Sequence, residues 1–432
     1  MKKLLTLLVA AMMTVACCFG LVGCGDTVKE YSGIKKVENV ADIQIGFICL
    51  HDETSTYDKN FIEAIKQAAE NKGIPAANVH FKTDIKESSA CYDAAVELIE
   101  NYKCNVVFAD SFGHESYMLQ AANEYPDVQF CHATGTHAHT AVRGNFHNAF
   151  ASIYEGRYLA GVAAGLKLQE LVSSDALTAN NYDEDGNIKL GYVGAYTYAE
   201  VMSGYTSWYL GVKSIVPNVV MNVRFTGTWY DYDLEKSAAN TLIGNGCALI
   251  SQHADSLGAP DACADAGIPN VSYNVATTAM SEKPAIAATY VTASRINWVP
   301  YFEYVIDCLV SGTEIALDWT GTLNNGAVEI LAIGDAAAAG TAEKLEEVKG
   351  KLLSGEIRVY DVNNFTVKGQ KLTSYRADVD DMGDYVPETE VIFADSFAVD
   401  AITYFHESAN GLRSAPYFDI EIDGITLDNR VY

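Results

Sequence analysis

The feature that most constrains this chain is a regular alternation of short apolar runs with helical stretches, which begins near residue 42. Strand-like runs fall at residues 43–50, 79–81, 105–109 and 128–132, with helix-like stretches between them at 58–71, 88–102 and 115–124. In the first helix-like stretch, Phe61 and Ile65 recur at helical spacing, and Gly73 and Pro75 end the pattern. An order of strand, helix and strand is typical of a parallel sheet covered by helices, so the sequence predicts a doubly wound α/β fold.

The alternation starts again after residue 149, which predicts a second lobe of the same class. A helical stretch covers 149–171, and strand-like runs follow at 189–194, 219–225, 248–251 and 271–273. Later come a strand at 286–291, a helix at 300–309, a strand at 315–319 and a helix at 335–353. We expect an N-terminal lobe of residues 42–146 plus 278–312, and a C-terminal lobe of 147–277 plus 313–355. The acidic tail at 356–432 is expected to be an extension, and the pattern does not place it.

The charge balance excludes one large class of partner. The chain has 432 residues, with 29 Lys and Arg against 56 Asp and Glu, so its formal net charge is −27. Proteins that bind nucleic acids follow the phosphates with basic patches, so we expect no nucleic acid as a partner. A hydrophobic content of 49% and an aromatic content of 11% still indicate a globular protein with a real core.

The N-terminus has the pattern of a secretory signal. Lys2 and Lys3 precede an apolar run from residue 4 to 22, and Gly23 and Cys24 follow it. Residues 21–24 resemble the bacterial lipobox, in which the Cys thiol is acylated and the chain is cut before it. The sequence therefore predicts a signal peptide at 1–23, lipidation of Cys24, a tether at 24–41 and an extracytoplasmic protein anchored to the bacterial cell membrane. An ordinary signal peptide and an uncleaved signal anchor are the alternatives.

Seven cysteines lie downstream of residue 24. They are Cys49, Cys91, Cys104, Cys131, Cys247, Cys263 and Cys308. Their number is odd, no pair has the C-x-x-C spacing, and several lie within or beside apolar runs. This pattern favours buried free thiols over a structural disulfide or a cysteine metal site.

The segments that directly follow the predicted strands mix aromatic and hydrogen-bonding side chains. Ligands of open α/β sheets bind at the carboxyl ends of the strands, so these segments are the candidate binding site. The candidates for stacking are Tyr57, Phe112, Tyr196 and Trp229, and those for polar contacts are Asp52, Ser111, Asp231, His253, Asp255 and Asn274. Such a set suits a flat heterocycle or a sugar ring, although each aromatic residue taken singly could also pack between the lobes.

Neither a metal site nor a catalytic site is favoured. Four histidines lie within 16 residues, at His132, His137, His139 and His147. Most of them lie in a Thr- and Gly-containing loop, so zinc is the less favoured interpretation. The acidic run at 378–384 has Met382 at the fifth position, where a calcium-binding EF-hand loop needs Asp or Asn. The chain has no G-x-S-x-G, H-E-x-x-H or P-loop motif, and we predict no cofactor.

Several motifs together resemble one known family. The segment His-Ala-Thr-Gly at 132–135, followed by Tyr-Glu-Gly-Arg-Tyr-Leu-Ala-Gly at 154–161, is similar to the basic membrane protein family. The similarity continues in the second half at 191–196, 228–231, 252–256 and 273–274. Members are lipid-anchored substrate-binding proteins of ABC transporters, best known for purines and nucleosides. The resemblance implies a two-lobe periplasmic-binding-protein fold of type I, a small-molecule ligand, a permease partner and no enzymatic activity.

Three positions depart from the pattern of the purine-binding branch. Thr54 and Ser55 stand where a Gly-Trp pair is frequent, Thr197 where Pro is common, and Ala276 where Asp is common. The resemblance therefore implies an importer component that most readily takes a purine or nucleoside, with a sugar as the alternative ligand. A ligand-sensing receptor with the same clamp and a surface-anchored hydrolase are the other classes that the residues leave open.

Overall fold

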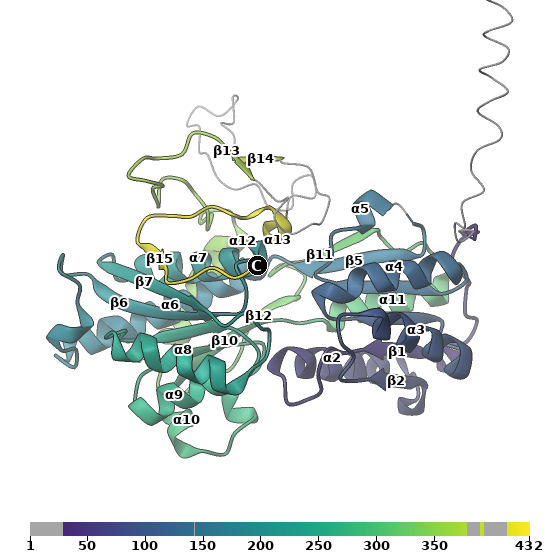
Figure 1. The fold of residues 1–432 in the computed structure, drawn as a ribbon, viewed down its shortest axis with the longest axis horizontal. Helices are drawn as coiled ribbons and strands as arrows, with labels where there is room; N and C mark the ends of the chain where they lie inside the picture. The colour runs from purple at the N-terminus through teal and green to yellow at the C-terminus, as the bar shows by residue number, and fades with distance from the viewer. Residues whose placement is uncertain (1–28, 142, 378–388, 393–412) are drawn as a thin grey trace, which may run out of the picture.

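The computed structural model describes residues 29–141, 143–377, 389–392 and 413–432, which form two α/β lobes side by side (Figure 1). The predicted signal peptide, Cys24 and the acidic run at 378–384 lie outside the described residues. Within the described ranges, no helix combines the length and the apolar content that a membrane crossing requires.

The first lobe is built on a six-stranded parallel sheet. Its order is β11 (Asp318–Gly321), β5 (Phe146–Ala151), β4 (Gln129–Ala133), β3 (Val106–Ala109), β1 (Ile45–Ile48) and β2 (Val79–Lys82). Helices α3 (Ser89–Tyr102) and α4 (Glu115–Glu124) bury one face, and α2 (Thr56–Lys72) and α11 (Val299–Ser311) bury the other. On the second face Phe302 of α11 packs edge-on against Phe47 and Phe108, with ring centroids 5.8 and 5.0 Å away.

The second lobe repeats this plan with seven strands. Its order is β12 (Val328–Ile330), β10 (Tyr290–Ile296), β9 (Asn270–Tyr273), β8 (Ile250–His253), β6 (Ile188–Gly194), β7 (Val219–Phe225) and β15 (Ile425–Leu427). Only β12 pairs in antiparallel orientation among these strands. The helices of this lobe are α6 (Ile153–Ser173), α7 (Ala199–Lys213), α8 (Tyr232–Gly244), α9 (Gly258–Ala266), α10 (Pro284–Thr289) and α12 (Thr341–Leu353). The short helices α5 (Ala138–Ala141) and α13 (Ser414–Tyr417) and the pair β13 (Tyr375–Ala377) and β14 (Thr389–Ile392) complete the described elements.

Helices α6 and α7 touch through their backbones, which explains Gly161, the last residue of the 154–161 motif, and Gly211 opposite it. A Cβ atom on Gly161 would lie 2.1 Å from the carbonyl oxygen of Trp208, and one on Gly211 would lie 2.2 Å from that of Tyr158. Because no side chain fits at either position, the two glycines allow α7 to pack directly on α6. This packing holds the second half of α7 against α6.

The periodic pattern identified most elements but misjudged two of them. The predicted helix at 149–171 begins with a strand, β5, because a short buried run such as 146–151 has no periodicity that separates strand from helix. The predicted strand at 286–291 is mostly helix α10, which starts with Pro284 at a position where proline favours helix, and strand β10 begins only at Tyr290.

The pairings also correct the predicted lobe boundaries. Strand β10 was assigned to the N-terminal lobe but pairs with β9 in the second sheet, whereas β11 was assigned to the C-terminal lobe but pairs with β5 in the first. The chain therefore crosses between the lobes after β5, after β10 and after β11. Sequence periodicity gives the type of an element but not the sheet edge that it joins, which is why these boundaries were wrong.

All seven cysteines downstream of residue 24 are buried and free, as the sequence predicted. The first-lobe core holds Cys49 and Cys91, for example, at 0% exposure. They act as small apolar residues of the two cores.

A buried carboxylate holds the loop that follows β4. Glu115 of α4 is 3% exposed and accepts hydrogen bonds from the backbone nitrogens of Thr136 and His137 and from the Nδ2 atom of Asn148. His137 Nδ1 lies 2.7 Å from Glu115 Oε2. Burial opposes ionisation, but the hydrogen bonds from His137 and the nearby His132 outweigh it and lower the pKa of Glu115 to about 2. The carboxylate is therefore ionised and fixes a loop that reaches the space between the lobes.

Replacing this carboxylate should destabilise the fold in a pH-dependent way. We expect Glu115→Gln to lower the free energy of unfolding by about 2 kcal/mol at pH 7, because the amide cannot accept the full set of hydrogen bonds. The folded-state pKa lies below the unfolded one, so this contribution exists above about pH 4.5 and disappears as the pH falls toward 2. Urea unfolding at several pH values measures it, with Glu346→Gln on an exposed face of α12 as the control. An equal loss of stability at pH 7 and pH 3 would contradict this role.

Candidate functional site

A cavity lies between the lobes, at the carboxyl ends of the parallel strands, with about 370 Å³ of space free of protein atoms, part of it open to solvent. Its lining from the first lobe consists of Leu50, His51, Tyr57, Asp58, Ser111, Phe112 and Thr134, and that from the second lobe of Glu200, Trp229, His253 and Asp255. A second cavity of about 290 Å³ shares Phe112, Thr134, Glu200 and Trp229 with the first and adds Thr136, Tyr198 and Ala415. Both sheets therefore deliver their strand-end loops to one shared space, as open α/β sheets do.

Six of the predicted ligand-binding residues line this cavity. They are Tyr57, Ser111, Phe112, Trp229, His253 and Asp255. The other four, Asp52, Tyr196, Asp231 and Asn274, are not among its lining residues, and their surroundings show what they do instead.

Tyr196 belongs to an aromatic cluster behind the cavity wall. Its ring stacks on that of Tyr198, with centroids 5.0 Å apart and planes 10° apart, and meets the edge of Trp229 at 5.1 Å. Tyr198 in turn lies 5.8 Å from Phe112 of the first lobe. Tyr196 therefore supports Trp229 and Tyr198, the two rings of the cluster that line a cavity.

Asp52 and Asp231 make local contacts with their own loops. Asp52 accepts hydrogen bonds from the backbone nitrogen and the hydroxyl of Thr54, at 2.9 and 2.6 Å. Asp231 is the N-cap of α8 and accepts a hydrogen bond from the backbone nitrogen of Leu234 at 2.9 Å. Asn274 is 1% exposed and has a left-handed backbone with φ 65°, so it forms a turn after β9.

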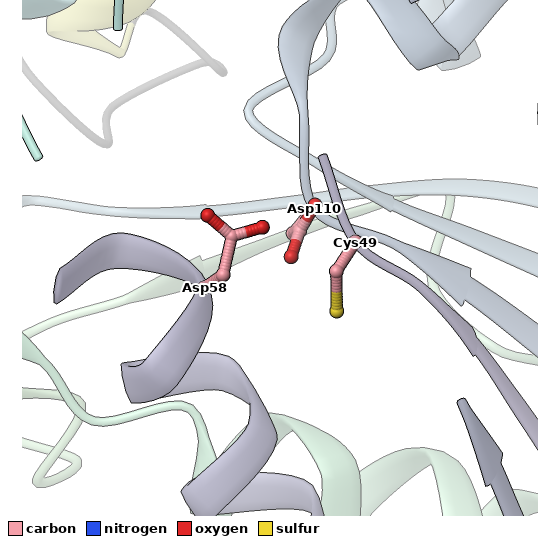
Figure 2. Close-up of side chains that lie close together, drawn as sticks. All are labelled: Cys49, Asp58 and Asp110. Carbon is pink, nitrogen blue, oxygen red and sulfur yellow. The ribbon is translucent and has the colours of Figure 1, made fainter. Parts of the chain in front are cut away.

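The first lobe brings two carboxyl groups and a thiol together below the cavity. Figure 2 shows Cys49, Asp58 and Asp110, and their potential ligand atoms all lie within 4.8 Å of one another. Asp58 accepts a hydrogen bond from the backbone nitrogen of His51 at 2.9 Å, and Asp110 from that of Leu50 at 3.2 Å. The carboxyl pair therefore holds the first part of the loop that follows β1.

Burial favours neutral forms of two groups in this cluster. Burial, followed by the charge of Asp58, raises the pKa of Asp110 well above its usual value. Burial also raises the pKa of Cys49 well above the ordinary value of a thiol. The cluster forms the base of the cavity through its hydrogen bonds to the loop after β1, and Asp58 is its cavity-lining member.

The sequence analysis did not single out Asp58, although a signal for its position existed. Ser55 is the N-cap of α2 and accepts a hydrogen bond from the backbone nitrogen of Asp58 at 3.2 Å. The segment Ser-Thr-Tyr-Asp at 55–58 has the spacing of a capping box and marks the first turn of the helix. This turn directs Asp58 back toward the loop after β1.

The second lobe places a neutral histidine between a carboxylate and a buried arginine. His253 Nε2 lies 3.3 Å from Glu200 Oε1. Burial, followed by the charge of Arg157, lowers the pKa of His253 to about 4 against the opposing effect of Glu200, so the ring is uncharged at pH 7. The guanidinium of Arg157 lies 3.3 Å from the ring centroid of Tyr273 and donates a hydrogen bond to the carbonyl of Gln252 at 2.9 Å. Arg157 thus packs against the residues next to His253 and does not line the cavity itself.

Asp255 lies at the contact between the lobes. Its carbonyl oxygen accepts a hydrogen bond from the backbone nitrogen of Thr56 in the first lobe at 2.8 Å. Burial, followed by the charges of Glu235, Asp58 and Glu200, raises the pKa of its carboxyl group well above the usual range. The side chain can therefore act as a hydrogen-bond donor or acceptor inside the cavity.

The cavity thus has a distinctive chemistry. Tyr57, Phe112 and Trp229 offer ring surfaces, and Asp58, Glu200 and Asp255 offer oxygen atoms for hydrogen bonds. Among the described residues that line it, there is no Lys or Arg. Such a lining accepts a flat or cyclic molecule with several hydrogen-bond donors, and it repels an anionic group such as a phosphate.

The histidines that the sequence analysis weighed as zinc ligands have other partners. His132 Nε2 lies 2.7 Å from the carbonyl oxygen of Ser111, and His147 Nε2 lies 2.9 Å from Gln129 Oε1. His137 contacts Glu115, as described above. These three rings hold loops and strands of the first lobe. The side chain of His139 lies outside the described residues.

Solved structures with the same architecture include two solute-binding proteins. An ABC transporter solute-binding protein of Conexibacter woesei superposes with a TM-score of 0.57 at 19% identity, over 73% of this chain and 98% of that one. Another such protein, of Aeropyrum pernix, gives a TM-score of 0.59 at 15% identity, over 76% of this chain and 94% of that one. This likeness confirms the predicted two-lobe periplasmic-binding-protein fold.

Two curated relatives differ in the ligand that their names give. A putative ABC transporter glucose-binding protein of Haloferax volcanii is 28% identical over 256 residues, which is 59% of each chain. The match therefore spans about three fifths of that relative's length. A purine-binding protein of Brucella abortus is 27% identical over 317 residues, which is 73% of this chain and 79% of the relative.

The family itself follows from a match over most of the chain. The sequence model of the Bmp family, described as ABC transporter substrate-binding protein PnrA-like, matches residues 48–363. This range includes every cavity-lining residue except Ala415. The chain therefore belongs to the Bmp family of PnrA-like ABC transporter substrate-binding proteins.

Proposed function

We propose that this protein is the lipid-anchored receptor of a bacterial ABC importer, which captures an uncharged purine nucleoside or purine base between its lobes. The observation that carries the proposal is the lining of the cavity, in which aromatic rings alternate with carboxyl groups and no cationic side chain is found among the described residues. A purine ring offers a flat surface and ring N–H groups, and a ribose adds hydroxyl donors. A purine-binding relative of the same family supports this ligand class.

The ligand is expected to contact the residues that both lobes supply. Phe112 of the first lobe and Trp229 of the second are the proposed stacking partners, and Tyr57 adds a third ring. Ser111, Asp58, Glu200, His253 and Asp255 are the proposed polar contacts. Each lobe contributes both stacking and polar contacts, so the ligand makes all of them only when the lobes are closed. Because the ligand binds the closed form more tightly than the open one, binding drives closure.

The proposed location outside the cytoplasm combines the family with the N-terminal pattern. Substrate-binding proteins of ABC transporters are extracytoplasmic, and lipidation of Cys24 would attach this one to the membrane. The described part of the tether lies along the first lobe, where the backbone nitrogen of Val37 donates to the carbonyl oxygen of Leu309 at 2.9 Å and the Tyr31 hydroxyl donates to Glu314. A permease that recognises the closed lobes is the proposed partner.

A sugar is the second candidate ligand. The relative from Haloferax volcanii is named as a putative glucose-binding protein. Carboxyl groups accept hydrogen bonds from sugar hydroxyls, and aromatic rings pack on the C–H face of a sugar. The same cavity chemistry therefore supports both ligand classes, and a direct comparison of ligands separates them.

Thermal unfolding in the presence of inosine, adenine, D-glucose and inosine monophosphate tests the ligand class. We expect inosine or adenine to raise Tm, because a ligand at 100 times its Kd adds about 2.7 kcal/mol to the free energy of unfolding. Inosine monophosphate should give no shift, because its phosphate would face Asp58, Glu200 and Asp255 without a cationic partner. A rise in Tm with D-glucose alone would show that the ligand is a sugar and not a purine. A rise in Tm with the monophosphate equal to that with inosine would contradict the proposed cavity chemistry.

The stacking wall has its own test. Trp229→Ala should raise the Kd for inosine about tenfold or more, because it removes a ring contact of roughly 1.5 kcal/mol together with buried apolar area. Isothermal titration calorimetry measures this change. Tyr102→Ala is the matched control, since Tyr102 is a 40% exposed aromatic residue of the first lobe that does not line the cavity. Equal affinities of the two variants would refute stacking on Trp229.

A further inference from the structure

The chain continues well beyond the part that matches the family. The match ends at residue 363, and residues 364–432 follow it. The end of this extension is fixed to the second lobe, where β15 pairs in parallel with β7. The backbone nitrogen of Thr197 donates to the carbonyl oxygen of Val431 at 2.7 Å, and that of Val431 donates to the Thr197 hydroxyl at 2.9 Å. The last residues thus hold the loop that carries Tyr196 and Tyr198.

An earlier part of the extension is also anchored on the second lobe. Phe418 is fully buried, and its ring centroid lies 4.4 Å from that of Tyr360. The Tyr360 hydroxyl donates to the carbonyl oxygen of Ser203 in α7 at 2.9 Å. Helix α13 packs against α7, and Figure 1 shows it near the junction of the lobes.

Arg413, directly before α13, contacts the opposite lobe. It is 2% exposed, and its Nη2 atom donates to the carbonyl oxygen of Gly135 at 3.1 Å. Its Nη1 atom lies 3.0 Å from Oδ1 of Asp318 on β11, and its guanidinium carbon lies 5.7 Å from the ring centroid of Phe150 on β5. All three partners belong to the first lobe.

The residue between these anchors forms part of the binding space. Ala415 lines the smaller cavity together with Thr134 and Thr136 of the first lobe and Tyr198 and Trp229 of the second. The segment from Arg413 to Phe418 therefore spans both lobes and closes one side of the space between them.

We infer that Arg413 is a positioning residue, which ties the first lobe to the extension and holds the lobes near their closed arrangement before a ligand arrives. The lobes are joined by three chain crossings and by a backbone hydrogen bond from Thr56 to Asp255. The Arg413 contact adds a buried ion pair to these links. Opening must separate a buried ion pair and leave both charges in a poorly solvated place, which is costly. A receptor held near its closed form binds more tightly, because a larger fraction of molecules is competent to bind.

The distance between the lobes in the ligand-free protein tests this inference independently of the ligand. Nitroxide labels on Glu53→Cys and Asp233→Cys report it by double electron–electron resonance. Both residues are exposed. Glu53 lies in the loop after β1 and Asp233 in the first turn of α8, close in sequence to His51 and Tyr230, whose ring centroids lie 5.3 Å apart. The seven buried cysteines should remain unlabelled, and a labelled parent protein without the added cysteines checks this.

In this background, Arg413→Ala should shift the distance distribution to longer values and broaden it. Arg430→Ala is the matched control, because Arg430 pairs with Glu421 at 2.5 and 2.8 Å within the same extension and does not reach the first lobe. Arg413→Gln keeps most of the packing of the side chain and serves if the alanine variant fails to fold, and Asp318→Asn removes the charge on the other side. Distances in Arg413→Gln and Asp318→Asn that equal those of the parent would overturn the inference.

Affinity gives a second measurement. If inosine binds the parent protein, Arg413→Gln should raise its Kd at least threefold, whereas Arg430→Ala should leave it unchanged. This measurement depends on the proposed ligand, but the distance measurement does not. Failure of inosine to bind would therefore count against the proposed function only, and unchanged lobe distances against the inference only.

Discussion

The parallel arrangement of both sheets is the constraint on which the binding site depends. In a parallel sheet the loops that follow the strands gather at one edge, and the two lobes bring these edges face to face. The three chain crossings keep the edges opposed while they allow rotation. The direct backbone contact between α6 and the second half of α7, made possible by Gly161 and Gly211, holds α7, the helix that carries Glu200, against the second lobe.

Charge is the second constraint, because the site concentrates carboxyl groups in a poorly solvated place. Burial, followed by the charges of neighbouring carboxyl groups, raises the pKa values of Asp110 and Asp255 well above the usual range. The buried guanidinium of Arg157 lies against Tyr273 and is not part of the cavity lining. Carboxyl groups in such a poorly solvated place need hydrogen-bond donors, so the site is selective for molecules that donate hydrogen bonds.

Sequence reasoning predicted the fold class and most of the cavity, because both follow from the alternation of elements and from the loop positions after the strands. Sequence reasoning failed for loop aspartates, because the same side chain can contact a ligand or accept a hydrogen bond from its own backbone. Asp52 and Asp231 lie at the right places for a ligand contact, yet a short carboxylate next to a free backbone nitrogen in a tight loop turns back to its own chain. The Asp58 position was encoded in the helix-capping pattern, whereas the contact of Arg413 with Asp318 joins residues 95 positions apart and leaves no local signal.

The most direct test of the account is a crystal structure of the protein grown with inosine. The account predicts the purine ring between Phe112 and Trp229, with its polar edge within hydrogen-bond distance of carboxyl groups from both lobes. A structure in which inosine binds elsewhere, or in which the cavity between closed lobes holds a sugar instead, would contradict it.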